Sequence, residues 1–339
     1  MRHTCGEMDE NNSPVAQKPA VGPVGSSWAE KRERHLVVAT WLKVASCAAL
    51  LLCTVASTLF IEASKSADGS FPYNSFTIPC AVEACKFCIS GILLVISKLS
   101  GKVDEVFLDP RRFAYFSLPA MCYFISNNCA LLVVRELGPT TYQVSTNLKV
   151  LTTGILMRAF LGRRLSWLRW KALILLVLGT VVTQLPSECF LNGEKGNFVG
   201  YVFVFVNSLA SGAGGVVSEL LLKSGTQTDS IHWQNMQLYA FGFVFGLATS
   251  LLSSGEHKAG LFVGFNPWAY ACIASLSLGG ILVSFVLKYI DNFAKCFVAS
   301  FSIITVSAAQ CLIYHEAPKI NVVVGITLTC MALEQYNMN

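Results

Sequence analysis

Long apolar blocks constrain the fold of this chain more than any other feature. Each block is roughly 20 residues long, and ~20 apolar residues in an α-helix cross the ~30 Å hydrocarbon core of a bilayer. Of the 339 residues, 53% are hydrophobic and 13% are charged, whereas soluble domains carry about 25% charged residues. A membrane β-barrel needs short segments of alternating polarity, and these blocks are too long and continuous for it. The sequence therefore predicts an all-α polytopic membrane protein.

The blocks can be divided into ten candidate transmembrane spans. Their ranges are 36–61, 74–98, 112–135, 139–160, 167–186, 197–222, 234–254, 267–290, 293–314 and 320–336. The connections at residues 136–138 and 291–292 are very short, so we expect each to join antiparallel neighbours.

Ten spans also divide into two sets of five. A repeat with an odd number of spans inserts with inverted topology the second time, which places a binding site near the middle of the membrane. We therefore expect a disordered tail over residues 1–35, a first five-helix repeat over 36–186 and a second over 197–336.

The distribution of Lys and Arg predicts the orientation. With ten spans, 17 of the 25 Lys and Arg residues fall on the side of the termini, 5 fall on the opposite side and 3 lie within spans. Because positive charge concentrates on the cytosolic side, both termini are expected in the cytosol.

Two lysines in or near the apolar blocks predict an anion site. Lys149 lies about 15 Å along a helix from Pro139, and a lysine near the bilayer centre costs at least ~2.5 kcal/mol unless it faces a wet cavity or a partner. Lys295 lies near the start of the ninth span, and the two ammonium groups could hold a phosphate by charge-assisted hydrogen bonds. The alternative for each is a lysine that snorkels to the interface.

Other polar residues within the spans have two interpretations each. Glu83 and Lys86 share a helix face, so they neutralise each other or line a cavity. Asn127 and Asn128 suit the edges of a nucleobase or sugar, or they join helices by hydrogen bonds.

Aromatic and small residues leave similar alternatives open. Tyr142 and Tyr239 could stack on a base or anchor the chain at the membrane interface. The small residues at 211–215 and at Gly279 and Gly280 permit close approach of a ligand or of another helix. For Gly242 and Gly246, spaced four apart, helix packing is the favoured interpretation. Glu219 lies near the cytosolic end of the sixth span.

The sequence contains no arrangement typical of an enzyme. No Ser-His-Asp set, catalytic carboxylate pair or histidine-based metal spacing is found, and the five histidines lie in tails, loops or span ends. The 13 cysteines are scattered, mostly within spans, where small buried hydrophobic residues are the simplest interpretation. We expect no catalytic residues, no metal, no cofactor and no nucleic-acid partner.

A series of motifs occurs in order over residues 36–335 and resembles the nucleotide-sugar transporter family. The similarity is greatest to the CMP-sialic acid and UDP-galactose transporters, especially the plant and algal ones. The motifs are Asn127-Asn128, 141–144 with 147–149, Leu165-Ser166 with Trp170, Ser211-Gly212 with Glu219, 233–239, Gly279-Gly280 and 288–295.

The resemblance implies a ten-helix drug/metabolite transporter fold with a 5+5 inverted repeat. It also implies a Golgi-membrane antiporter that exchanges a cytosolic nucleotide sugar for a luminal nucleoside monophosphate, with homo-oligomers possible. In the family, lysines matching Lys149 and Lys295 contact phosphate. The expected surroundings of the substrate are Asn127, Asn128, Tyr142, Ser211, Gly212, Asn235, Tyr239, Gly279, Gly280, Ser284 and Lys288, with Glu83, Lys86 and Glu219 in the cavity or its gate.

The chain departs from the family pattern at several positions, which leaves the base and the sugar open. Thr146 replaces a tyrosine, Asn147 replaces a glutamine, and Val217-Ser218 replaces an aromatic pair. Two other functions are considered: export of a different small solute by the same superfamily, and a membrane scaffold in which the lysines pair with Glu83 and Glu219.

Overall fold

The computed structural model describes the backbone over residues 23–66, 71–74, 77–101, 109–162, 165–184, 198–224, 230–253, 262–313 and 320–338. Side chains are described within these ranges from residue 40 onward, except at 131, 135, 138–141, 143–146, 184, 252–253, 310–313 and 337. The chain divides into two compact units, Met1–Leu42 and Lys43–Asn339, and all the contacts below lie within the second.

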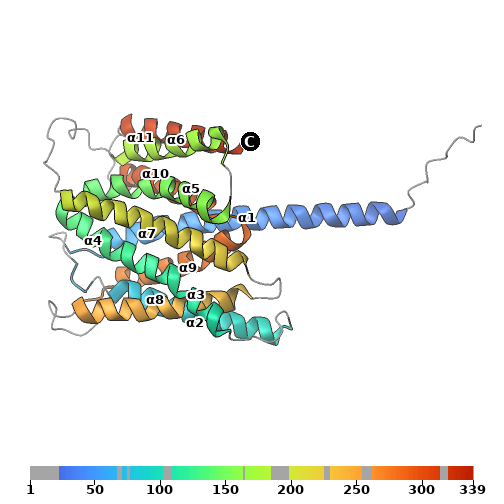
Figure 1. Cartoon of the computed structure of the whole chain (residues 1–339), viewed down its shortest axis with the longest axis horizontal. Helices are drawn as coiled ribbons and strands as arrows, with labels where there is room; N and C mark the ends of the chain where they lie inside the picture. Colours follow the sequence, from blue (N-terminus) through green and yellow to red (C-terminus); the bar gives the residue numbers. More distant parts are fainter. Residues whose placement is uncertain are drawn as a thin grey trace, which may run out of the picture. The chain divides into compact units, whose positions relative to one another are not determined.

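The regular structure within those ranges is helical, without strands (Figure 1). The helices are α1 (Pro23–Ala63), α2 (Thr77–Leu99), α3 (Pro110–Tyr115), α4 (Ser117–Thr146), α5 (Leu148–Leu161), α6 (Trp167–Gln184), α7 (Phe198–Lys223), α8 (Ile231–Ser253), α9 (Pro267–Tyr289), α10 (Asn292–Ile313) and α11 (Ile320–Asn337).

Six segments of the described chain are long and apolar enough to cross a membrane. They are Thr40–Ala63, Thr77–Leu99, Pro110–Val134, Phe198–Lys223, Pro267–Tyr289 and Asn292–Ala309. Many large apolar side chains on these helices are exposed, including Leu52, Ile92 and Phe205, as expected of surfaces that face lipid. The prediction of an all-α polytopic membrane protein is therefore confirmed.

Two boundaries differ from the sequence prediction. Helix α1 begins at Pro23, inside the range 1–35 expected to be a disordered tail, while residues 1–22 lie outside the described ranges. Proline is favoured at the first position of a helix, and the Ala, Glu, Lys and Arg residues that follow are good helix formers.

The predicted turn at residues 136–138 is wrong. Helix α4 continues through these residues to Thr146, and the chain leaves the helix only at Asn147. Gly138 and Pro139 both disfavour a helix interior, but helices that cross a membrane tolerate them because neighbouring helices satisfy the freed backbone groups. As a result α4 packs mainly against α7 and α8 rather than against α5. The other predicted turn is confirmed within one residue, at Ile290 and Asp291 between α9 and α10.

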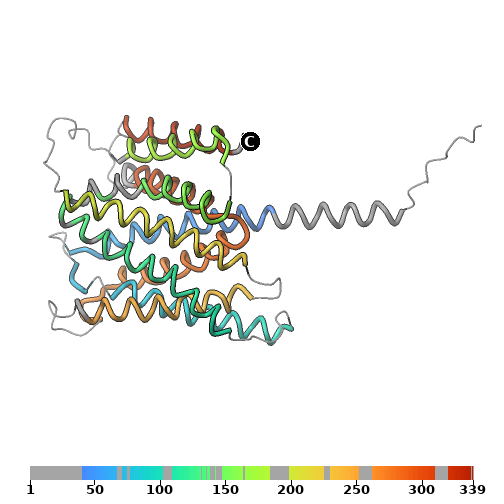
Figure 2. The backbone as a smooth tube through the Cα atoms, viewed as in Figure 1, coloured from blue at the N-terminus to red at the C-terminus, as the bar shows by residue number. Residues whose placement is uncertain are grey.

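Helices α6 and α11 run side by side at one edge of the bundle (Figure 2). Glycines allow this crossing, because a Cβ atom at Gly179 would lie 2.8 Å from Thr329 Oγ1. The inner face of the pair packs on α5, α7 and α10 through a buried apolar cluster that includes Met157, Val216 and Phe293.

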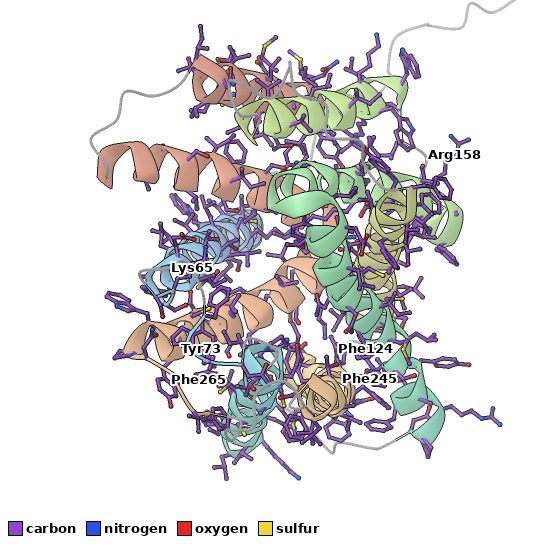
Figure 3. The ribbon with its side chains drawn as sticks, turned by 90° about the vertical axis from the view of Figure 1, so that its left-hand side faces the viewer. Lys65, Tyr73, Phe124, Arg158, Phe245 and Phe265 are labelled. Atoms are coloured by element: carbon purple, nitrogen blue, oxygen red, sulfur yellow. The ribbon has the colours of Figure 1, made fainter. Side chains whose placement is uncertain are left out.

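An aromatic cluster joins the loop between α1 and α2 to the loop before α9. The rings of Tyr73 and Phe265 lie 4.7 Å apart between centroids (Figure 3). The Tyr73 hydroxyl shares a hydrogen bond of 2.6 Å with Ser64 Oγ, and Asn266 Nδ2 donates to the Ser64 carbonyl at 2.8 Å. This "aromatic latch" (Ser64, Tyr73, Phe265, Asn266) holds one end of the bundle together.

Candidate functional site

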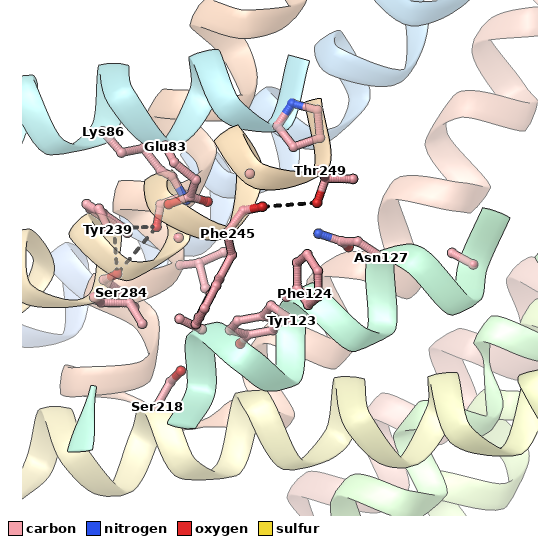
Figure 4. Close-up of a pocket in the computed structure, with 18 of the residues that line it drawn as sticks. Glu83, Lys86, Tyr123, Phe124, Asn127, Ser218, Tyr239, Phe245, Thr249 and Ser284 are labelled. Atoms are coloured by element: carbon pink, nitrogen blue, oxygen red, sulfur yellow. Dashed lines mark hydrogen bonds and ion pairs between the residues drawn. The ribbon is translucent and has the colours of Figure 1, made fainter. Parts of the chain in front are cut away.

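A cavity of about 760 Å³ lies between α2, α4, α7, α8, α9 and α10 (Figure 4). This volume is within the range of ~300–1,000 Å³ typical of small-molecule sites. Most of its wall is apolar, and polar side chains interrupt it at Glu83, Lys86, Asn127, Asn128, Tyr142, Ser218, Tyr239, Thr249, Ser284 and Lys295. This cavity is called the large cavity below, and its wall combines apolar surface with a few polar groups.

The two asparagines of α4 differ in what they offer to this cavity. Asn128 Nδ2 donates to the Phe124 carbonyl one turn earlier at 2.8 Å, so this donor is used within the helix. Asn127 is exposed and points into the cavity (Figure 4). Phe124 lies beside them, with its ring 5.5 Å from that of Phe245. An exposed amide next to a pair of aromatic rings is a suitable surface for a nucleobase.

Tyr239 joins three helices on the opposite wall. Its hydroxyl shares a hydrogen bond of 2.9 Å with Ser284 Oγ and donates to the Gly280 carbonyl at 3.3 Å (Figure 4). The Lys86 ammonium lies 4.4 Å from the centroid of the Tyr239 ring and forms an ion pair with Glu83. The positive charge of Lys86 is therefore already balanced within the protein.

Gly280 is necessary for this arrangement. A Cβ atom there would lie 2.5 Å from Lys86 Cδ, so any larger residue would force the lysine chain to shift from its present path across α9.

A second cavity, of about 170 Å³, adjoins the first and is called the small cavity below. Its polar lining consists of Thr54, Lys149, Thr153, Ser211, Lys295 and Cys296, and Lys295 and Val283 line both cavities. Neither Lys149 nor Lys295 forms an ion pair with a carboxylate in the described part of the chain. Two ammonium groups in one pocket repel each other and attract an anion.

Glu219 lies outside both cavities and is fully buried. Its Oε1 accepts from Lys223 Nζ at 2.7 Å, and its Oε2 accepts from the Asn292 backbone N–H at 2.8 Å. Lys223 Nζ also donates to the Ile290 carbonyl at 2.6 Å. This "carboxylate brace" (Glu219, Lys223, Ile290, Asn292) ties the end of α7 to the α9–α10 turn.

Four further residues expected around the substrate also lie outside both cavities. Lys288 Nζ donates to Gln234 Oε1 at 2.7 Å. Gly212 packs on α5, where a Cβ atom would lie 2.9 Å from Thr152 Oγ1, and Gly279 faces Cys53. Asn235 is fully buried, and its amide has no hydrogen-bond partner among the described residues. Helical position alone could not show which neighbour each of these residues meets.

The cavities also contain residues that the sequence did not single out. Tyr123 lies one turn before Asn127, and its ring centroid is 5.9 Å from the Lys295 ammonium. Thr249 continues a helical stripe through Tyr239, Gly242 and Gly246, all of which line the large cavity. This stripe, with spacings of three and four residues, was a signal that could have identified Thr249.

Comparison with known proteins gives a consistent picture. A family model described as "Nucleotide-sugar transporter" matches residues 38–337. The chain is 30% identical to CMP-sialic acid transporter 1 of Oryza sativa subsp. japonica over 306 residues, which cover 86% of this chain and 93% of that protein. It is 32% identical to the UDP-N-acetylglucosamine transporter of Homo sapiens over 278 residues, covering 78% and 85% respectively.

A solved crystal structure that is 11% identical matches 87% of this chain and 96% of its own chain with a TM-score of 0.66, which shows a shared fold. The family match spans both cavities and nearly all of the helices described above. The chain belongs to the nucleotide-sugar transporter family.

Proposed function

We propose that this protein exchanges a cytosolic nucleotide sugar for a luminal nucleoside monophosphate across the Golgi membrane by alternating access. The observation that carries the proposal is a pair of lysines, Lys149 in the small cavity and Lys295 in both cavities, that form no ion pair with a carboxylate in the described part of the chain. The relatives are named for CMP-sialic acid and UDP-N-acetylglucosamine. In both compounds the negative charge lies between a nucleoside and a sugar. This matches the position of Lys295, whose ammonium lines both cavities.

In this proposal the phosphate binds Lys149 and Lys295, and the rest of the ligand occupies the large cavity. Asn127, Phe124 and Tyr239 supply amide and aromatic surfaces suited to a nucleoside. The pocket around Lys86 and Glu83 is electrically balanced, so it accommodates an uncharged part of the ligand at little electrostatic cost.

Exchange follows from the same two lysines. Closing an empty site would bury two like charges away from water, which is costly. A bound phosphate removes this cost, so the protein changes the side to which its site opens only when a ligand is bound, and a ligand is carried in each direction. CMP, UMP and their sugar conjugates are all anions, so each can serve in one direction.

Alternating access requires the central site to open first to one side of the membrane and then to the other. Ten spans in two five-helix repeats, over 36–186 and 197–336, would supply halves that rock about a central site. The aromatic latch and the carboxylate brace are suited to be the two gates, because each joins segments far apart in the sequence. The excess of Lys and Arg on the side of the membrane where the termini lie supports placing both termini in the cytosol.

The test is counterflow with purified full-length protein in liposomes preloaded with CMP, UMP, GMP or AMP. We expect one or two of these nucleotides to drive uptake of labelled CMP-sialic acid or UDP-N-acetylglucosamine and to raise the unfolding temperature. Lys149→Ala and Lys295→Ala should each abolish uptake while leaving a folded protein. The proposal fails if none of the four nucleotides exchanges or stabilises the protein.

A membrane scaffold is the alternative from another class, and the side-chain contacts do not favour it. A scaffold requires the buried lysines to be neutralised by Glu83 and Glu219. Those two carboxylates are bound to Lys86 and Lys223.

A further inference from the structure

Two buried polar side chains beside Lys295 have no hydrogen-bond partner in the part of the chain that the structure describes. Ser218 is 2% exposed and lines the large cavity, and its hydroxyl is unpaired. Asn292 is 1% exposed, and both atoms of its amide are unpaired. Buried polar groups are nearly always paired in folded proteins, so two such residues at one place need an explanation.

Gly215 brings these groups together. A Cβ atom at Gly215 would lie 2.6 Å from Asn292 Nδ2, 2.8 Å from Asn292 Oδ1 and 2.9 Å from Lys295 Nζ. The Asn292 amide and the Lys295 ammonium therefore both pack against the α-carbon of Gly215. Ser218 is three residues further along α7, so it lies on the same face of the helix. Figure 4 shows Ser218 on the side of α7 that faces Tyr123.

The chemistry of the three groups defines what they can bind. Lys295 only donates hydrogen bonds, whereas the Ser218 hydroxyl and the Asn292 amide both donate and accept. A phosphate only accepts at neutral pH, so it would leave Asn292 Oδ1 unpaired. A hydroxyl next to the phosphate would satisfy both kinds of group, because it donates one hydrogen bond and accepts others.

We propose that Ser218 and Asn292 form a subsite for a ring hydroxyl adjacent to the phosphate that Lys295 holds. This inference rests on the proposed function, because it assumes a nucleotide at Lys295. The hydroxyl belongs either to the ribose or to the transported sugar, which are joined to the phosphate on its two sides.

The test is the affinity of purified full-length Ser218→Ala for the nucleotides that bind the wild type. Isothermal titration is done with CMP, UMP, their 2′-deoxy forms, CMP-sialic acid and UDP-N-acetylglucosamine. Losing one hydrogen bond should weaken binding about five- to ten-fold. If ribose is bound, the monophosphate and the nucleotide sugar weaken equally, and the preference over the 2′-deoxy form disappears. If the transported sugar is bound, only the nucleotide sugar weakens.

Asn292→Ala provides a second test. It should give the same pattern as Ser218→Ala, because the Asn292 backbone N–H still donates to Glu219. Ser302→Ala is the matched control, since it removes a buried hydroxyl of α10 that lies outside both cavities and already donates to the Ala299 carbonyl at 2.7 Å.

The outcomes separate this inference from the function it rests on. The subsite is overturned if the wild type binds a nucleotide and both Ser218→Ala and Asn292→Ala bind all ligands as well as Ser302→Ala does. Buried water would then satisfy these groups. If the wild type binds no nucleotide, the proposed function fails and the subsite fails with it.

Discussion

Lys86 and Lys295 reach the same cavity from different helices and have opposite surroundings. Lys86, on α2, forms an ion pair with Glu83 and lies over the Tyr239 ring. Lys295, on α10, has no carboxylate partner in the described chain and lies 5.9 Å from the Tyr123 ring centroid. Lys86 is buried and Lys295 is half-buried, but within the described chain only Lys86 is balanced by a carboxylate of the protein.

The difference shows how to separate structural from ligand-binding charges in a membrane protein. A buried charge is tolerated only when something compensates for it. Where the fold supplies a carboxylate, the charge serves the structure, as it also does for Lys223 with Glu219. Where the fold supplies none, the compensation is left to a ligand, and Lys149 and Lys295 are in this position.

The largest effect should come from breaking a fully balanced pair. Glu219→Ala leaves the Asn292 N–H without its acceptor and the Lys223 ammonium with the Ile290 carbonyl but no carboxylate, and we expect a loss of about 3 kcal/mol in the free energy of unfolding. Thermal unfolding in detergent measures it. Glu62→Ala is the control, because Glu62 forms an ion pair with Lys65 that is largely exposed and worth less than ~1 kcal/mol. If Glu219→Ala and Glu62→Ala unfold at the same temperature, the carboxylate brace does not stabilise the fold as we expect.

Removing each lysine should sharpen the contrast between them. Lys295→Ala should weaken nucleotide binding about 50-fold with little loss of stability, because it removes a charged donor used only by the ligand. Lys86→Ala should do the reverse and lower the unfolding temperature, because Glu83 would remain half-buried without its partner. Titration calorimetry and thermal unfolding of the same samples test both. If Lys295→Ala and Lys86→Ala change nucleotide binding and the unfolding temperature to the same extent, the distinction between a ligand-binding and a structural lysine is wrong.

Glu83→Gln should turn Lys86 into a second unbalanced cation. The substitution preserves the shape of the side chain and removes its charge, so the large cavity becomes more positive. We expect anionic nucleotides to bind about ten-fold more tightly at low salt, and the gain to shrink as salt increases. An affinity that does not change at any salt concentration would show that Lys86 is too far from the ligand to act on it.

The smallest effect is expected at the glycine that Lys86 crosses. Gly280→Ala should push the ammonium away from the Tyr239 ring and cost about 1 kcal/mol of stability. Gly279→Ala is a close control, because the nearest atom to its Cβ would be Cys53 Cβ at an ordinary 3.5 Å. If the neighbouring variant is as unstable as Gly280→Ala, the lysine crossing is not the reason for the glycine.

The sequence predicted the helices and the charged residues well because both depend on local patterns. A lysine in an apolar block is conspicuous at any position, so Lys149, Lys295, Glu83 and Lys86 could be found without a structure. The ranges expected for α6 to α11 also end within a few residues of the helices. The turn predicted at 136–138 is absent, because a helix that crosses a membrane can continue through Gly138 and Pro139.

The partners of these residues could not be predicted, because they are distant in the sequence. Glu219 binds the Asn292 backbone 73 residues away, and nothing in the local pattern distinguishes this role from a place in the cavity. Gly212 and Lys288 were expected around the substrate, but helical periodicity defines only the face on which a residue lies. Ser218 and Asn292 were not predicted to bind a ligand, because an unpaired buried group exists only once the helices have packed.

The position of Lys295 in both cavities has a consequence for how a ligand is held. A phosphate in the small cavity and a nucleoside in the large cavity would meet at one ammonium, so two separate molecules would compete for the space around it. A nucleotide presents both parts in one molecule, and once its phosphate is bound, its nucleoside is at millimolar effective concentration beside the second cavity. The shared wall thus makes the covalent bond between phosphate and nucleoside itself a determinant of recognition.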